Sequence, residues 1–197
     1  MAKTEIENLS IYLYFVLKGL IKGEKEHVKT YMKAFNLRIR ESIDDTIGPS
    51  NVRCNICGWK GNRFKTFVSS PPFIRHNAMC PRCLSLERHR EFFEIFKETR
   101  TRCPEHIKLL DIAPNYAFSQ YCKKDPSIDY LSVDLKLKLA MRHMDIQALE
   151  LESKLFDMVI CFHVFDYVKN DKQGLKEIHR VLKDDGLAII QEGVDWN

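Results

Sequence analysis

The stretch "KLLDIAPNYAFSQY", residues 108–121, decides the fold class of this chain. Its apolar start is typical of a strand that is buried on both faces of a parallel sheet. The strand runs into a loop at Ala113, Pro114 and Asn115, where a nucleotide-binding sheet normally carries glycines. The stretch therefore predicts a first strand whose loop lies at a ligand site but has an altered chemistry.

Four further stretches are candidate strands, namely "IDYLSVDL", a short "RHMDI", "FDMVICFHVF" and "GLAIIQE". A helical pattern over residues 171–182 precedes the last stretch, and we expect Gly186 in "KDDG" to end that helix with a positive φ. Strands that alternate with helices at this spacing predict an α/β chain. The expected fold is a Rossmann-like, doubly wound, mostly parallel sheet.

Two carboxylates follow the second and third strands of this predicted sheet. Ligands of open parallel sheets bind at the carboxyl ends of the strands. Asp134 ends the second strand, where a carboxylate suits the hydroxyls of a ribose. Asp145 follows the third strand, where it suits the amino group on an adenine edge.

The composition is that of a globular protein with an uneven charge distribution. Hydrophobic residues make up 45% and charged residues 29% of the 197 residues, which excludes a disordered chain. Residues 51–106 carry 11 Lys/Arg against 5 Asp/Glu, so this middle part could bind phosphates or nucleic acid. The apolar run "IYLYFVLKGLI" is 11 residues long, too short for a membrane span, and no signal-sequence cleavage pattern follows it. We therefore expect a cytoplasmic protein.

Seven cysteines include two close pairs, Cys54-x2-Cys57 and Cys80-x2-Cys83, separated by 22 residues. The odd number argues against a secreted disulfide framework, and the spacing is typical of a zinc ribbon. Four thiolates complete the tetrahedron of Zn²⁺, so the ion is expected to be structural. Gly58 directly follows the first pair, where a tight knuckle needs a small residue. The other cysteines, expected to be ordinary buried thiols, are Cys103, Cys122 and Cys161.

Basic and aromatic side chains surround the cysteine pairs. Basic groups could meet phosphates while aromatic rings stack on bases, which would make the ribbon a nucleic-acid-binding module. Alternatively, the rings form the small core of the ribbon itself. The aromatic residues are Trp59, Phe64, Phe67 and Phe73.

Residues 4–40 have the hydrophobic spacing of one or two helices. We expect this segment to pack on the rest of the chain, and the alternative is a helix that lies on a membrane surface. "DDTIGPSN", residues 44–51, is typical of a linker, because Gly-Pro-Ser-Asn does not continue a helix. The predicted domains are a helical segment over residues 1–50, a zinc-ribbon module with its following helix over 51–105, and the sheet domain over 106–197.

Together these motifs resemble a known family, the class I S-adenosylmethionine-dependent methyltransferases. More narrowly, they resemble a methyltransferase type 11-like subgroup in which a four-cysteine zinc ribbon precedes that domain. The motifs that carry the resemblance, over residues 52–194, are "CNICGW", "NAMCPRCLSLERHR", "LLDIAPN", "YLSVDL", "MDIQAL", "FDMVICFHVFDYV" and "EIHRVLKDDGLAII". The resemblance implies a methyltransferase that takes S-adenosylmethionine, holds a structural Zn²⁺ and acts on an unidentified methyl acceptor.

The resemblance also implies cofactor-binding roles for residues along the sheet. The methionine part, the ribose and the adenine would each meet a separate group of residues. In chain order these are Asp111 for the methionine part, Ala113, Pro114 and Asn115 as a backbone cradle, Asp134 for the ribose, Asp145 and Ile146 beside the adenine, and Cys161 and His163 lining the pocket of the methyl donor.

His163 is the candidate for a catalytic base, since an imidazole ordinarily titrates near neutral pH. Asp166 is expected to orient this histidine or to contact the acceptor. Methyl transfer from a sulfonium depends mainly on alignment in a dry pocket. A base is therefore needed only where the acceptor must lose a proton.

Two features depart from the family pattern. The loop lacks glycines: Ala113 fits there if its φ stays negative, whereas Pro114 removes an amide donor. The sequence ends at "QEGVDWN", soon after the fifth strand, where the family continues with a helix and an antiparallel strand pair. We expect the exposed sheet edge to be covered by the N-terminal helices or by self-association. The alternative function is a non-catalytic ribbon module that binds nucleic acid or protein, on a degenerate or truncated methyltransferase scaffold.

Overall fold

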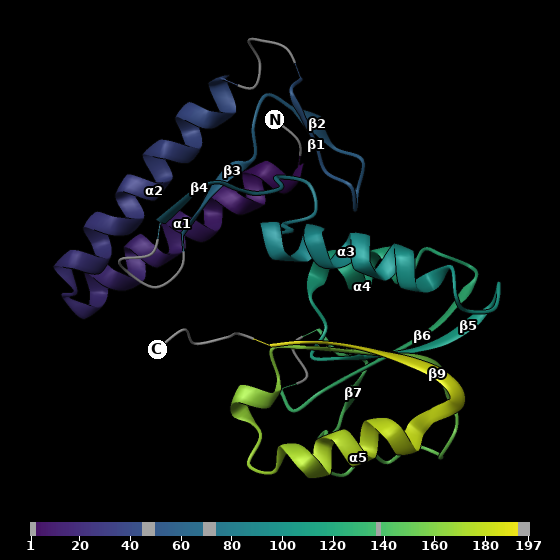
Figure 1. The fold of residues 1–197 in the computed structure, drawn as a ribbon. Helices are drawn as coiled ribbons and strands as arrows, with labels where there is room; N and C mark the ends of the chain where they lie inside the picture. The colour runs from purple at the N-terminus through teal and green to yellow at the C-terminus, as the bar shows by residue number, and fades with distance from the viewer. Residues whose placement is uncertain (1–2, 45–49, 69–73, 137–138, 193–197) are drawn as a thin grey trace, which may run out of the picture. The chain divides into compact units, whose positions relative to one another are not determined.

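The computed structural model describes residues 3–44, 50–68, 74–136 and 139–192 (Figure 1). The chain divides into two compact units, Met1–Glu91 and Phe92–Asn197. The predicted helical segment and the predicted ribbon fall together in the first unit, and the sheet lies in the second. Most of the predicted linker and the sequence end, residues 45–49 and 193–197, lie outside the described residues.

Two helices joined by a short turn begin the first unit. They are α1 (Lys3–Lys22) and α2 (Lys25–Asp44), which confirms the predicted helices. Gly23 follows α1 with a φ of +70°, a conformation that suits a residue without Cβ. The helices approach closely at Gly19, where a Cβ would come within 2.9 Å of Val28 Cγ2. Phe15 and Tyr31 stack across this contact, with ring centroids 4.9 Å apart.

Two antiparallel strand pairs form the ribbon. The second pair is tied to α2 by buried polar contacts. The carboxylate of Glu41 accepts a hydrogen bond from Thr66 N at 3.0 Å, and Lys65 Nζ donates to the Glu41 carbonyl at 2.6 Å. The strands are β1 (Val52–Arg53) with β2 (Lys60–Gly61), and β3 (Lys65–Val68) with β4 (Ile74–Met79).

Helix α3 (Glu87–Arg100) follows the ribbon, and the boundary between the units falls within it. Its aromatic residues recur at helical spacing, and Phe92, Phe93 and Phe96 are buried. Phe92 and Phe96 meet the ring of Phe118 edge-on, at centroid distances of 5.2 and 4.8 Å. These aromatic contacts join the C-terminal part of α3 to the second unit.

The second unit is built on a five-stranded parallel sheet in the order β7-β6-β5-β8-β9. Helix α4 lies on one side of the sheet and α5 on the other (Figure 1). This arrangement confirms the predicted Rossmann-like, doubly wound fold. In chain order the elements are β5 (Ile107–Ile112), α4 (Tyr116–Cys122), β6 (Ile128–Asp134), β7 (Arg142–His143), β8 (Phe156–Phe162), the 3-10 turn η1 (Phe165–Tyr167), α5 (Asp171–Val181) and β9 (Leu182–Gln191).

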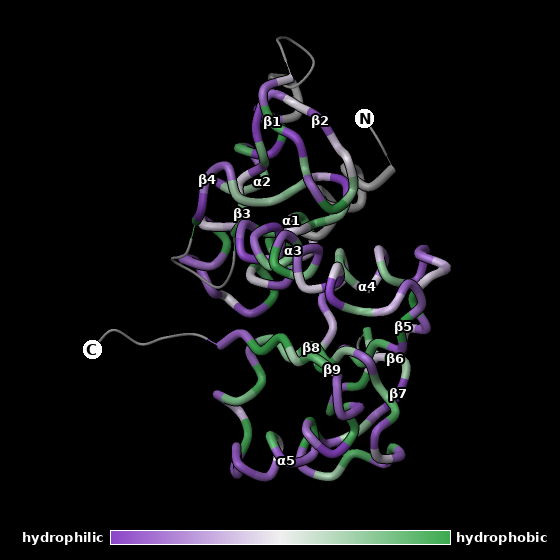
Figure 2. Tube along the Cα trace, turned by 45° about the vertical axis from the view of Figure 1, so that its right-hand side comes forward, coloured by the Kyte–Doolittle hydropathy of each residue, from purple (hydrophilic) through white to green (hydrophobic). Residues whose placement is uncertain are grey.

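The centre of the sheet is the core of this unit. All residues of β8 are buried, as the continuous apolar run predicts for a strand covered on both faces. The hydrophobic colouring follows β8 and the neighbouring β9 (Figure 2). On the side of α5, Ile178 and Val181 pack with Val159 and Cys161.

Strand β9 begins earlier than predicted, and Gly186 has a different role. Helix α5 ends at Val181, and Leu182 is already extended, with φ −71° and ψ 142°. Gly186 lies within β9 and outside the left-handed region, so its predicted helix-ending role is wrong. A Cβ on Gly186 would come within 3.0 Å of the Phe156 carbonyl oxygen. The glycine is therefore required by a close strand contact, where the β8–β9 register shifts between Phe156 and Met158.

Candidate functional site

Four sulfur atoms meet at the centre of the ribbon. Cys54 Sγ lies 3.7 Å from Cys83 Sγ, and Cys57 Sγ lies 3.6 Å from Cys80 Sγ. A tetrahedral site with Zn–S bonds of about 2.3 Å has sulfur atoms about 3.8 Å apart. The structure therefore brings all the predicted ligands together, at a spacing that could hold a zinc ion.

Each cysteine pair is folded into a knuckle with the same hydrogen bonds. Gly58 N donates to the Cys54 carbonyl, and Leu84 N donates to the Cys80 carbonyl, both at 2.9 Å. Gly58 and Leu84 have φ values of +71° and +62°. The position of Gly58 agrees with the prediction from its sequence. The sequence did not predict that Leu84 takes the matching position in the second knuckle, because the left-handed region costs leucine about 1–2 kcal/mol.

Ser85 supports the cluster beyond its four possible ligands. Its Oγ lies 3.5 Å from Cys54 Sγ and 3.2 Å from Cys83 Sγ. A hydroxyl at this place can donate to a thiolate, the form in which cysteine binds a metal. Hydrogen bonds from the neighbouring cysteines, Cys57 first, lower the pKa of Cys54 far below its usual value. The arrangement thus favours the deprotonated, thiolate form of at least one of the four cysteines.

The aromatic rings around the ribbon contact other side chains of the ribbon. The rings of Trp59 and Phe64 have centroids 5.7 Å apart, and the guanidinium of Arg90 lies 3.7 Å from the Phe64 centroid. Arg75 lies 5.2 Å from the centroid of Phe67. Each of these rings thus has a partner within the first unit, and all three are half-buried. The fourth predicted ring, Phe73, lies outside the described residues.

A pocket of about 170 Å³ opens at the carboxyl ends of β5, β6 and β8, where the sequence predicts a ligand site. Its lining is mainly apolar and includes Met144, Val164 and Val168. The predicted residues that line it are Ala113, Asp134, Ile146 and His163. The predicted residues outside this lining are Asp111, Pro114, Asn115, Asp145, Cys161 and Asp166.

Two of the predicted residues are buried in the sheet. Asp111 is 2% exposed and accepts a hydrogen bond from Tyr130 Oη at 2.6 Å. Burial raises the pKa of Asp111 to about 7. Cys161 is fully buried, and burial raises the pKa of its thiol well above the usual value. Both side chains are therefore buried within the sheet, and neither lines the pocket described above.

The loop after β5 has an unusual backbone. Ala113 has a φ of +57°, so the condition for alanine to fit this loop without strain, a negative φ, is not met. Its N–H donates to the Val133 carbonyl at 2.9 Å, which keeps the loop close to β6. Asn115 caps α4, because its side-chain oxygen accepts a hydrogen bond from Phe118 N at 3.0 Å. The loop thus turns as a glycine loop does, although it holds no glycine.

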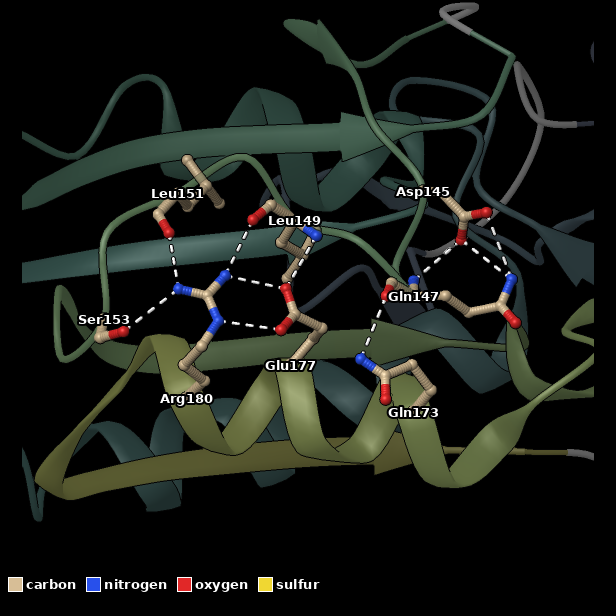
Figure 3. Close-up of polar contacts among 8 residues, drawn as sticks. All are labelled: Asp145, Gln147, Leu149, Leu151, Ser153, Gln173, Glu177 and Arg180. Carbon is tan, nitrogen blue, oxygen red and sulfur yellow. Dashed lines mark hydrogen bonds and ion pairs between the residues drawn. The ribbon is translucent and has the colours of Figure 1, made fainter.

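The carboxylates after β6 and β7 are held by short local turns. Asp134 Oδ1 accepts a hydrogen bond from Lys136 N at 3.1 Å, and this side chain reaches the pocket. Asp145 Oδ1 accepts from Gln147 N at 2.8 Å, and both of its oxygens lie 3.2 Å from Gln147 Nε2 (Figure 3). Asp145 is therefore turned to Gln147, and its neighbour Ile146 faces the pocket instead.

Arg180 of α5 anchors the loop that follows Ile146 (Figure 3). Its guanidinium donates to both oxygens of Glu177 at 2.8 Å, to the Leu151 carbonyl at 2.7 Å and to the Leu149 carbonyl at 2.8 Å. Glu177 in turn accepts from Leu149 N at 2.8 Å. Hydrogen bonds from Arg180 hold the pKa of Glu177 below its usual value. The arginine of the sequence motif "RVLK" thus fixes one wall of the pocket.

His163 lies at the edge of the pocket with two carboxylates beside it. Its imidazole and the carboxylates of Asp166 and Glu192 offer ligand atoms that all lie within 4.8 Å of one another. His163 has a φ of +51° and donates its backbone N–H to the Gln191 carbonyl at 2.8 Å. Glu192 Oε1 accepts hydrogen bonds from the next two amides, Val164 N and Phe165 N, at 3.1 and 3.2 Å.

Glu192 is a candidate site residue that the sequence reasoning missed. The signal was present, since this glutamate ends the predicted fifth strand "GLAIIQE", and the carboxyl ends of parallel strands share one edge. Its contacts hold the loop after β8 in place, and therefore the position of His163.

Comparison with known proteins bears on the second unit. Residues 94–190 match the family model described as "Methyltransferase domain". Among solved structures, a candidate S-adenosyl-L-methionine-dependent methyltransferase from Methanococcus maripaludis is 16% identical, with a TM-score of 0.42, over 50% of this chain and 54% of that chain. The PH0226 protein from Pyrococcus horikoshii is 23% identical, with a TM-score of 0.44, over 53% of this chain and 57% of that chain.

The chain thus spans little more than half the length of these solved structures. No curated protein sequence matches it.

Proposed function

Because residues 94–190 belong to the methyltransferase-domain family, we propose that this protein is an S-adenosylmethionine-dependent methyltransferase with a structural zinc ion in its ribbon. The observation that supports this most is the pocket at the carboxyl ends of β5, β6 and β8. It combines one carboxylate, one imidazole and an apolar wall. The methyl acceptor is not identified by any of these residues.

The residues of the pocket fit the parts of this cofactor. The carboxylate of Asp134 suits the ribose hydroxyls, and Ile146 with Met144 offers apolar contact to an adenine ring. The backbone at Ala113, which lines the pocket, would meet the methionine part of the cofactor. The cavity of about 170 Å³ is smaller than the roughly 300–1000 Å³ typical of ligand clefts, so the cofactor would extend through its mouth.

The bound cofactor supplies an activated methyl group on a sulfonium. The chain contributes alignment and exclusion of water, through the apolar lining at Val164 and Val168. We assign His163 as the group that accepts a proton from the acceptor. Glu192 positions the loop that carries it. Asp166 has a carboxylate oxygen within 4.8 Å of the imidazole, and we assign it to orienting this ring or contacting the acceptor once the cofactor is bound.

Isothermal titration of the zinc-loaded full chain with S-adenosylmethionine tests this proposal. We expect binding by the parent protein and a loss of at least about tenfold in affinity for Asp134→Ala, since a ribose contact is lost. Asp129→Ala is the matched control, because Asp129 is exposed at the opposite end of the same strand. Absence of binding by the folded parent, or an equal loss in both variants, would overturn the proposal.

A second candidate function, nucleic-acid binding by the first unit, is favoured by one observation. Arg88 is partly buried beside Arg75, and both burial and this neighbouring charge lower the pKa of Arg88. Its Nε has no hydrogen-bond partner among the described residues. Glu87 partly offsets these charges, since its carboxylate lies 3.4 Å from Arg75, and an anion such as a phosphate would supply a partner for Arg88 as well.

Retention on immobilised RNA and DNA across a salt series tests this second function. We expect retention that falls with salt and that falls further in Arg88→Gln. The control is Arg102→Gln, which alters an exposed arginine shortly after the end of α3. Retention that is indifferent to salt, or equal in the two variants, would count against nucleic-acid binding.

A further inference from the structure

Helix α1 presents an exposed apolar stripe. Leu13, Leu17 and Leu20 are 45%, 52% and 60% exposed, and Tyr14 and Ile21 are 58% and 86% exposed. Spacings of three, four and seven residues place these side chains on one face of a helix. Large apolar side chains scattered singly are ordinary on a surface, whereas a contiguous stripe of five marks an interaction site.

This stripe is not the face that packs on α2. Phe15 stacks on Tyr31 of α2, and Gly19 lies against Val28. At about 100° per residue, Phe15 and Gly19 each point about 160° away from Leu17. Helix α1 is therefore apolar on two opposite faces, and α2 covers only one of them.

The two helices of the first unit carry an excess of positive charge. Lys18 points about 100° from Leu17 and borders the stripe, whereas Lys22 points about 140° from Leu17 and lies farther round α1. Between residues 13 and 40, six exposed Lys and Arg side chains stand against two exposed Glu side chains, a difference of +4. The stripe of a second copy of the chain would bring like charges together. A partner with an apolar interior and a negatively charged surface complements this face better than a second copy of the chain does.

We propose that this face of α1 binds the surface of an anionic lipid bilayer. The leucine and isoleucine side chains enter the boundary between headgroups and acyl chains, and the lysines contact the anionic headgroups. Among the described residues, no helix has the length and apolar character needed to cross a bilayer. The helix therefore lies in the plane of the surface, and the protein binds peripherally.

Vesicle co-sedimentation of the full, zinc-loaded chain tests the proposal. The vesicles contain phosphatidylcholine alone, or phosphatidylcholine with about one third phosphatidylglycerol. We expect binding to the mixed vesicles only, weakened at high salt because the lysine contacts are screened. Binding to neither kind of vesicle by the folded protein would overturn the proposal.

Two variants separate the apolar and the charged contributions. Leu17→Ser/Leu20→Ser/Ile21→Ser should lower the partition coefficient at least about tenfold, and Lys18→Gln/Lys22→Gln should lower it about 10- to 30-fold at low salt. Leu175→Ser, which alters a leucine that is 45% exposed on α5, is the matched control and should bind as the parent does. Circular dichroism and zinc content confirm that each variant is folded.

Two results would contradict the assignment. An equal loss in Leu175→Ser would show that binding is a general property of exposed leucines. Sedimentation that shows a parent dimer, a monomeric stripe variant and no vesicle binding would assign the stripe to a second copy of the chain instead.

Discussion

Three residues other than glycine occupy left-handed backbone at the two candidate sites, Ala113 and His163 beside the pocket and Leu84 beside the cysteines. Each of them donates a backbone hydrogen bond, Ala113 to Val133, His163 to Gln191 and Leu84 to Cys80. Surrounding contacts therefore hold a local conformation that the residue itself disfavours. The side chain of Ala113 is a single methyl group, so its own contacts offset little of this conformational strain.

Ala113→Gly should raise the free energy of unfolding of the second unit, by up to about 1 kcal/mol, because glycine adopts this φ without strain. Chemical denaturation followed by the near-ultraviolet signal measures the change. The matched control is Ala117→Gly, the same substitution four residues on, inside α4, where we expect destabilisation of about 1 kcal/mol or more. Destabilisation of the same size in both variants would contradict the strain at Ala113.

Asp111 should make the stability of the second unit depend on pH. Its pKa is raised from 3.8 to about 7 by burial, so the folded state holds the proton more tightly than the unfolded state. This stabilisation is complete below about pH 4 and is lost as the pH rises through about 7. The free energy of unfolding should fall by at most about 1.4 kcal/mol per pH unit over this range.

Asp111→Asn should flatten this part of the pH profile, because an amide of the same shape does not titrate. Denaturation at a series of pH values between 4 and 8 measures it. Asp129→Asn, exposed on β6, should keep the slope of the parent. A slope unchanged in Asp111→Asn would mean that another group titrates.

At the scale of elements, helix α5 does more than cover the sheet. The bidentate pair of Arg180 and Glu177 joins α5 to the chain between Leu149 and Leu151, so one helix end sets the course of the loop behind the pocket. Continuous apolar runs predicted the central strands β5 and β8, whereas the polar β7 and the early start of β9 carry no such signal. The carboxyl ends of the strands located Asp134 and His163.

Contacts between distant elements were beyond prediction from the sequence. The need for glycine at position 186 arises where β9 passes the Phe156 carbonyl, and Glu192 acts on amides that precede it by nearly thirty residues. The sequence also does not distinguish an aspartate near the end of a strand that faces a ligand from one that, like Asp111, faces a tyrosine.

Arg180→Ala should destabilise the second unit by about 1–3 kcal/mol, because it removes the charged partner of Glu177 and the donor to the Leu149 and Leu151 carbonyls. Thermal or urea unfolding measures the change. Lys176→Ala, an exposed position one turn earlier on α5, should change stability by no more than about 0.5 kcal/mol. If cofactor binding is found, it should weaken in Arg180→Ala as well. The loop that Arg180 anchors follows directly on Ile146, which lines the pocket.

At the scale of the whole molecule, the chain holds its two candidate sites in separate compact units. Among the described residues of the first unit, the hydrophobic cluster between the helices and the ribbon is small, made of Val16, Tyr31, Ala34 and Val68 with four partly buried neighbours. Such a core contributes little stability, so a structural metal would supply much of the rest. The second unit has a larger core and contains no cysteine of the cluster.

Removal of zinc should therefore unfold the ribbon and spare the sheet. Hydrogen exchange with and without a chelator should show protection lost in β1 to β4 and retained in β5 and β8. Cys80→Ser should give the same pattern without chelator, and Cys103→Ser should behave as the parent. Equal loss of protection in both units, or none in either, would contradict a structural zinc ion in the ribbon.

The two knuckles of the ribbon also differ in how readily each forms before any metal arrives. Gly58 enters its turn without strain, whereas Leu84 must be forced into the same conformation at a cost of about 1–2 kcal/mol. In the metal-free chain the first pair is therefore the better prepared of the two. We expect Cys54 and Cys57 to capture an incoming ion first, with the second pair closing over it, so the order of metal loading follows from one glycine.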